Sequence, residues 1–174
     1  MPEEIMIRPA TPDDVPRIAE IHIQSWKETY PGIMPQARLD ALNIDASMRN
    51  WQGALERNDV FLVAVVDGEI RAFAAGGANW SNKGCETGRA NACSGELAAL
   101  YSLRKDHGRG MGRALFEAYC ATLKSMGHET MVAWVAAKNP ACGFYERMGG
   151  ELLDKRDLMV MGTPVPIVAY GYRL

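Results

Sequence analysis

The sequence predicts a mixed α/β fold in which helices flank a central β-sheet, and three observations predict it. The chain has 174 residues, of which 48% are hydrophobic and 23% charged, a size and balance typical of a globular domain. Segments with helical and with strand periodicity alternate along the chain. No internal repeat, low-complexity tract or linker interrupts them, so we assign residues 1–174 to a single domain.

Two helical stretches open the chain. Thr11-Pro12-Asp13-Asp14 supplies a cap, a proline and first-turn acids, and apolar residues then recur at helical spacing up to Trp26. Tyr30-Pro31-Gly32 ends this helix, because proline cannot continue it and biases the preceding residue towards extended geometry. The second stretch runs from about Pro35 to Arg57, with a break near Asn43-Ile44-Asp45.

A hairpin and a strand form the middle of the chain. Residues 60–66 are apolar and rich in β-branched side chains, Asp67-Gly68 is a hairpin turn, and residues 69–75 pair back. A polar loop over residues 79–94 leads to a strand over residues 96–103.

The last third continues with helices and strands in turn. A glycine-rich run opens a helix that Gly127 ends, and a strand follows over residues 130–135. Asn139-Pro140 begins a short helix that extends to Met148. Two final strands, over residues 151–161 and 165–173, are joined at Gly162-Thr163-Pro164.

Composition argues against several functional classes. The formal net charge is −2, so nothing favours a nucleic-acid surface. No apolar run approaches the roughly 18 residues of a membrane span, and the first residues lack a signal-peptide pattern, so we expect a cytoplasmic protein with no membrane partner. The four cysteines form no CxxC pair and have no histidines at ligand spacing, so no metal site is expected.

The run HGRGMGRALF, from His107 to Phe116, places three glycines at alternate positions before a helix-forming segment. Clustered glycines indicate a backbone that another group approaches closely. A helix N-terminus favours anions, so we expect the main chain of residues 108–113 to bind phosphate, supported by the charges of Arg109 and Arg113. The alternative is a flexible turn with two solvent-facing arginines.

Two other phosphate-binding patterns do not fit this run. The dinucleotide fingerprint requires GxGxxG and an acid about 20 residues further on, whereas the spacing here is GxGxG and the next strand ends in Val135-Ala136-Ala137. A P-loop requires Lys-Ser or Lys-Thr after its last glycine, and neither is present.

Four segments together resemble a known family. They are Ile7–Asp14, Leu100–Leu103, His107–Gly112 and Asn139–Gly150. In content and order they resemble the GNAT superfamily of N-acetyltransferases, and the similarity covers nearly the whole chain. The run from His107 matches the signature Q/R-x-x-G-x-G/A except at its first residue, where the family has glutamine or arginine. The last segment resembles N-x-x-A-x-x-F-Y-x-x-x-G-F, with Gly150 in place of the final apolar residue.

The resemblance implies a GNAT-like fold, with a mixed, mostly antiparallel sheet and a splayed strand pair that holds CoA. It also implies acetyl-CoA as cosubstrate, its pantetheine arm on the splayed strand and its pyrophosphate on the glycine run. The residues so implied in binding are Tyr101, Ser102, Leu103, Gly108, Arg109, Gly110, Met111, Gly112, Arg113, Asn139 and Tyr145.

The activity implied is direct transfer of an acetyl group to a primary amine in a ternary complex. An ammonium must first lose a proton, the thioester oxygen needs a hydrogen-bond donor, and the leaving thiolate benefits from an acid. By its position before the signature, Glu96 is the candidate base, through water; the alternative is a carboxylate exposed at a strand end. Tyr145 is the candidate acid; the alternative is an aromatic residue of the core.

The N-terminal helices contain residues for which both a binding and a structural role stay open. Glu28 and Asp40 lie where relatives bind acceptors, although both also suit a charged surface. Four large side chains belong either to the core or to the wall of an acceptor site, and two histidines are expected to be ordinary surface or hydrogen-bonded residues. The large side chains are Trp26, Tyr30, Met34 and Trp51, and the histidines are His22 and His128.

The acceptor itself stays open at this stage, since the superfamily acetylates both small molecules and peptides. Family habit suggests a homodimer. A second hypothesis is a non-catalytic CoA-binding sensor, which needs the phosphate site but neither Glu96 nor Tyr145. A third, a nucleotide-binding domain, predicts binding of a dinucleotide in place of CoA.

Overall fold

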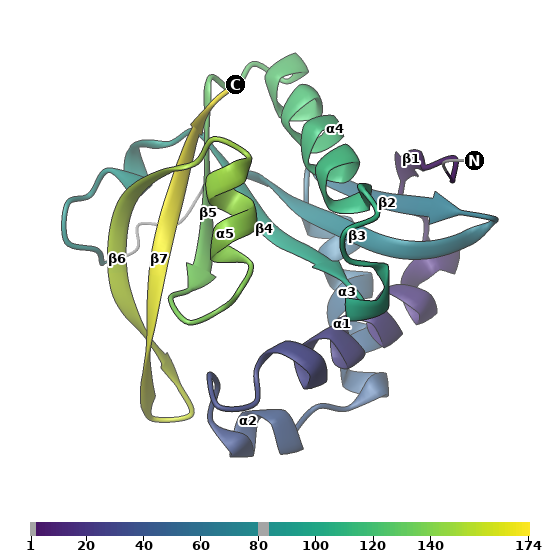
Figure 1. Ribbon diagram of the computed structural model, residues 1–174, viewed down its shortest axis with the longest axis horizontal. Helices are drawn as coiled ribbons and strands as arrows, with labels where there is room; N and C mark the ends of the chain where they lie inside the picture. Colours follow the sequence, from purple (N-terminus) through teal and green to yellow (C-terminus); the bar gives the residue numbers. More distant parts are fainter. Residues whose placement is uncertain (1–2, 80–83) are drawn as a thin grey trace.

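The computed structural model describes residues 3–79 and 84–174, and its centre is one seven-stranded sheet (Figure 1). The strand order is β1-β2-β3-β4-β5-β7-β6, and only β4 and β5 pair in parallel. The strands are β1 Met6–Pro9, β2 Val60–Val66, β3 Glu69–Ala78, β4 Gly95–Ser102, β5 Thr130–Ala136, β6 Glu151–Val160 and β7 Thr163–Arg173. The predicted class, a mostly antiparallel sheet flanked by helices, is confirmed.

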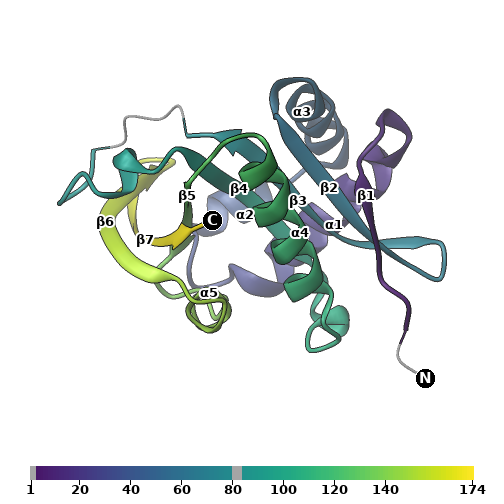
Figure 2. The same ribbon diagram turned by 90° about the horizontal axis from the view of Figure 1, so that it is seen from above.

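Helices cover both faces of the sheet. They are α1 Val15–Thr29, α2 Gln36–Asp40, α3 Ile44–Arg57, α4 Met111–Ser125 and α5 Cys142–Arg147. The helices α1 and α3 pack on one face of β2–β4, and α4 packs on the opposite face (Figure 2). The short α5 lies against β7, where the rings of Tyr145 and Tyr170 stack 5.9 Å apart. No helix of the described chain has the length and apolar character needed to cross a bilayer.

Most predicted elements are confirmed, with two corrections. Asp67-Gly68 forms the predicted hairpin turn, with φ of 51° and 78°. The strand β1 was not predicted, because its four residues are too few to show a strand period and become a strand by pairing with β2. The predicted helix from Asn139 begins only at Cys142, because the Asn139 side chain first forms a turn by accepting the Ala141 N–H at 2.8 Å.

A buried carboxylate fixes the segment before β4 against the outer strand β6. Asp154 of β6 accepts hydrogen bonds from the Thr87 N–H at 2.9 Å, the Thr87 hydroxyl at 2.8 Å and the Ala90 N–H at 3.3 Å. Burial alone would raise the pKa of Asp154, but these donors lower it well below the ordinary carboxyl value. The turn at Ala90–Ala92 is thereby held against the β6–β7 pair.

We predict that Asp154→Asn lowers the free energy of unfolding by about 1.5–3 kcal/mol at neutral pH, the range for hydrogen bonds to a charged group. A carboxyl whose pKa is depressed by folding stabilises the fold above its unfolded pKa, about 3.9, and loses that effect as the pH falls further. Urea unfolding at several pH values should therefore show the two proteins converging in acid. A gap independent of pH would contradict the role of the charge.

Candidate active site

The sheet opens between its two central strands. β4 and β5 pair only at Gly95 with Met131 and at Glu96 with Val132, and the strands then diverge (Figure 1). Beyond Glu96, the edge of β4 that faces β5 therefore has no strand partner in the described chain. A strand edge with free N–H and C=O groups can pair with an extended ligand. Tyr101 and Ser102 lie at the far end of this edge, and the buried Leu103 follows them.

The opening begins at a tight contact with α4. Tyr119 of α4 donates its hydroxyl to the Glu96 carbonyl oxygen at 2.7 Å. A Cβ atom at Gly76 of β3 would lie 2.3 Å from that carbonyl oxygen and 2.4 Å from the Tyr119 hydroxyl oxygen, so only glycine fits there. The register of β3 and β4 shifts at this point, between Ala75 and Gly76. The contact fixes the place where β4 parts from β5.

The glycine run forms a loop of unpaired N–H groups at the start of α4. Gly108 and Gly110 have φ of 76° and 85°, a left-handed conformation that favours glycine. The His107 N–H bonds to a carbonyl oxygen, and the next backbone N–H to donate in the described chain is that of Ala114, to Gly110 at 3.0 Å. All backbone N–H groups from Gly108 to Arg113 are therefore open to an acceptor, which suits an anion.

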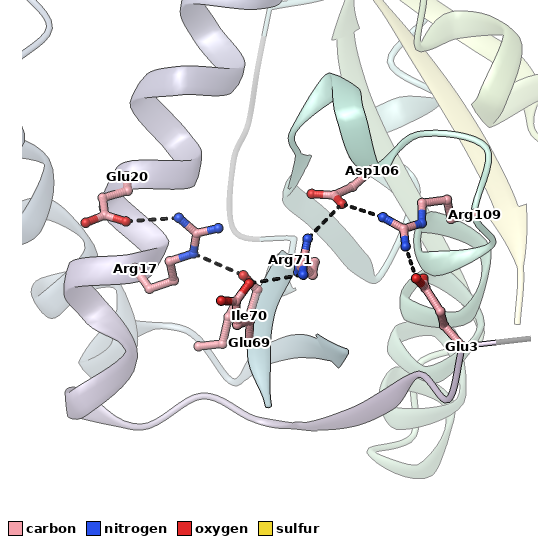
Figure 3. Close-up of polar contacts among 8 residues, drawn as sticks. All are labelled: Glu3, Arg17, Glu20, Glu69, Ile70, Arg71, Asp106 and Arg109. Atoms are coloured by element: carbon pink, nitrogen blue, oxygen red, sulfur yellow. Dashed lines mark hydrogen bonds and ion pairs between the residues drawn. The ribbon is translucent and has the colours of Figure 1, made fainter. Parts of the chain in front are cut away.

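The side chain of Arg109 is held by two carboxylates (Figure 3). Its Nη1 lies 3.2 Å from Asp106 Oδ1, and its Nη2 pairs with Glu3. The carboxylate of Asp106 is fully buried and also lies 3.4 Å from Arg71 of β3. These ion pairs attach the glycine loop to β3 and to the segment before β1. The main chain of the loop is thus open, whereas the Arg109 guanidinium is engaged by protein groups.

Arg113 and His107 are both exposed beside this loop. The Arg113 side chain has an exposed fraction of 64% and meets Glu117 at 3.7 Å, one helical turn further on. An exposed pair of this length is weak, so Arg113 can reorient towards a ligand. His107 ends the short turn Arg104–Asp106, and its N–H bonds to the Arg104 carbonyl oxygen at 3.1 Å.

Three tyrosines from distant parts of the chain meet beside the open edge. They are Tyr30 at the end of α1, Tyr101 of β4 and Tyr145 of α5. Burial raises the pKa of each phenol, and the nearby Tyr101 raises the pKa of Tyr30 and Tyr145 further. Asn139 joins the group by donating its amide N–H to the Tyr30 hydroxyl at 3.4 Å. The three phenols therefore stay protonated at neutral pH and can donate hydrogen bonds.

Glu96 lies elsewhere along the same strand. It pairs with Val132 at the last point where β4 and β5 are joined, and Tyr101 lies five residues further on. Five residues of extended strand span about 16 Å. Tyr101 thus acts electrostatically on Tyr30 and Tyr145, and Asn139 contacts Tyr30, whereas Glu96 lies at the other end of the opening.

The N-terminal helices supply an aromatic wall next to the tyrosines. Of its two expected settings His22 has the hydrogen-bonded one: it is buried, its Nδ1 lies 2.9 Å from Ser47 Oγ, and its ring contacts those of Trp26, Trp51 and Tyr101 edge-on. Burial, and to a lesser extent the charge of Arg38, lowers the pKa of His22 to about 4, so the ring is neutral.

The two carboxylates expected on the acceptor side, Glu28 of α1 and Asp40 of α2, both accept hydrogen bonds within the protein. Glu28 accepts the Arg104 N–H at 2.8 Å and so connects α1 to the end of β4. Asp40 is exposed and accepts the Gln36 amide at 2.9 Å.

A cavity of about 310 Å³ lies between the turn after α1 and the β6–β7 hairpin. It is lined by Gly32, Ile33, Met34, Pro35, Lys138, Thr163, Pro164, Val165 and Pro166. Ile33 and Met34 also pack with Tyr30 and Trp26, so the cavity adjoins the aromatic wall. Sequence reasoning missed the cavity because its two sides are more than 120 residues apart along the chain.

The chain is similar to known acetyltransferases in sequence. The model of the FR47-like protein family matches residues 85–159, which include the open strand, the glycine loop and α5. The chain is 28% identical to the N-acetyltransferase YuaI of Bacillus subtilis over 168 residues, which is 97% of this chain and 92% of that protein.

Two solved structures are similar over nearly their whole length. One is a GCN5-related N-acetyltransferase of Rhodopseudomonas palustris, with a TM-score of 0.75, 18% identity, and coverage of 97% of this chain and 95% of that one. The other is YncA of Salmonella typhimurium, a putative acetyltransferase solved with acetyl-CoA, with a TM-score of 0.71, 18% identity, and coverage of 98% and 94%. The chain therefore has the fold of these acetyltransferases, and the part that holds the open strand and the glycine loop matches the FR47-like family model.

Proposed function

We propose that the protein is an N-acetyltransferase that moves an acetyl group from acetyl-CoA to a primary amine by direct attack in a ternary complex. The observation that carries the proposal is the unbroken series of free N–H groups from Gly108 to Arg113, next to the open edge of β4. YuaI is named an N-acetyltransferase, and YncA was solved with acetyl-CoA, which supports the same donor here.

The described residues fit a CoA thioester. The free N–H groups at the start of α4 suit a pyrophosphate, with Arg113 near enough to add charge. Tyr101, Ser102 and Leu103 would present main-chain groups to the pantetheine amides. Asn139, which contacts Tyr30, and Tyr145, which is influenced by Tyr101, would line the acyl end.

Tyr145 is the proposed acid of the reaction. The new amide C–N bond forms as the thioester C–S bond breaks, and the departing sulfur takes up a proton. The raised pKa of Tyr145 keeps its O–H intact at neutral pH, and the hydroxyl lies in the group formed with Tyr101 and Tyr30. A main-chain N–H of β4 beyond Glu96 would stabilise the thioester oxygen as charge develops on it.

Glu96 is the proposed base, acting through water. Its place at the start of the opening allows a water chain along the unpaired edge of β4 towards the amine. An enzyme needs this group and Tyr145, whereas a CoA-binding sensor needs only the loop and the edge.

Acetyl-CoA should raise the melting temperature of the wild-type protein, and Gly110→Val should remove this shift. Gly110 has φ of 85° at the start of α4, and a β-branched residue disfavours that conformation, so the loop N–H groups would turn away. Gly127→Val is the matched control, since Gly127 has φ of 96° with nothing within 4 Å, at the far end of the same helix. An equal shift in wild type and Gly110→Val would place the cofactor elsewhere.

Substitution of the two arginines beside the loop should have different effects on CoA binding and on stability. Arg113→Ala should weaken CoA binding about tenfold, as expected for a charge-assisted phosphate contact, and leave stability unchanged because the side chain is exposed. Arg109→Ala should instead lower the free energy of unfolding, because it removes a partner of buried Asp106, and it should affect CoA only through the loosened glycine loop. Calorimetry with CoA and with S-acetylpantetheine, which lacks the phosphates, tests this. If Arg113→Ala lost equal affinity for both ligands, its side chain would not face the phosphates.

Tyr145→Phe should keep the fold and the affinity for CoA but slow acetyl transfer by about 10²–10⁴-fold, the usual range for general acid catalysis. Single-turnover measurement isolates the chemical step from product release. Tyr170→Phe is the control, since it removes a neighbouring phenol that bonds to Glu146 at 2.9 Å. A wild-type single-turnover rate for Tyr145→Phe would make Tyr145 a packing residue.

A further inference from the structure

Arg38 is a half-buried cation on the acceptor side of the opening. It lies on α2, with its guanidinium carbon 5.0 Å from the centre of the Trp26 ring. This is the distance of a cation–π contact, which fixes the planar group over the indole. No carboxylate of residues 3–79 or 84–174 forms an ion pair with it.

The charge of Arg38 influences the pKa of two residues near the open edge of β4. Burial lowers the pKa of His22, and the charge of Arg38 lowers it further; burial raises the pKa of Tyr101, and the charge of Arg38 opposes that rise. Tyr101 in turn belongs to the tyrosine group with Tyr145. A fixed positive charge therefore lies next to the place where the amine would meet the thioester.

The surroundings do not neutralise this charge. Asp40, the carboxylate nearest to Arg38 along the chain, accepts a hydrogen bond from the Gln36 side chain, and Glu28 of α1 accepts one from the Arg104 N–H. The cavity beside the aromatic wall is apolar apart from main-chain groups, the Thr163 hydroxyl and one further cation, Lys138, and no acid lines it. A volume of about 310 Å³ is at the small end for ligand sites, so a small molecule fits better than a protein segment.

We propose that the acceptor is a small primary amine that carries a carboxylate, such as an amino acid with an apolar side chain, and that Arg38 binds this carboxylate beside Trp26. The inference rests on the proposed function and names its substrate class. A guanidinium binds a carboxylate through two parallel hydrogen bonds, and stacking on Trp26 leaves its edge free for them. The apolar side chain would pack against Ile33 and Met34. The carboxylate takes no part in the transfer.

The test compares matched acceptors on wild type and variants. Methionine, leucine and phenylalanine are each offered as the free acid, the carboxamide and the decarboxylated amine, and CoA thiol release gives kcat/KM. We expect the acids to exceed their amides, and Arg38→Gln to lower kcat/KM for the acids about 10- to 100-fold with little change for the amides. Arg49→Gln, an exposed charge on α3, is the matched control, and CoA affinity must stay unchanged in both variants.

Binding is also measured without turnover, through quenching of tryptophan fluorescence by the same compounds with CoA present. Saturable quenching by the acids alone, lost in Arg38→Gln, supports the carboxylate site even if no acetyl transfer occurs, an outcome that refutes only the proposed function. Three results would overturn the inference: no saturable quenching by the acids, amides or amines that bind or react as well as the acids, or acid selectivity that disappears in Lys138→Gln but persists in Arg38→Gln.

Discussion

The early end of the pairing between β4 and β5 is the constraint on which the rest of the structure depends. Two parallel strands at the centre of a sheet would normally pair along their whole length, yet these two separate after Glu96. The separation leaves backbone N–H and C=O groups of β4 without strand partners, which is unfavourable unless water or a ligand satisfies them. An extended ligand with amide groups can form hydrogen bonds with these unpaired groups of β4.

Each half of the sheet has its own packing, which keeps the opening from closing. On one side, β2–β4 lie between α4 and the pair α1 and α3. On the other side, α5 packs against β7, and Asp154 secures the outer strand β6 to the segment before β4. The Tyr119 contact at Glu96 fixes where the halves part, and buried Asp106 fixes the glycine loop at the other end of β4.

Features that depend on local chemistry could be predicted from the sequence. The Asp67-Gly68 turn and the glycine loop need φ values that few residues adopt, so the residue types reveal them. Features that depend on distant partners could not. β1 is a strand only because β2 is beside it, and Arg109 looked free for phosphate because nothing local shows that Glu3 and buried Asp106 hold it. No sequence pattern marks Arg38 as a binding residue, because its contact with Trp26 forms only when α2 packs beside α1.

Amide hydrogen exchange with and without CoA tests the central claim most directly, because it reads each backbone N–H. The account requires that CoA slow exchange in two separate segments, residues 97–102 on the open edge of β4 and residues 108–113 in the glycine loop. Residues 62–65 of β2, already paired with both β1 and β3, should show no change. Protection of the loop with no protection of β4 would contradict the claim that the parted strands hold the cofactor.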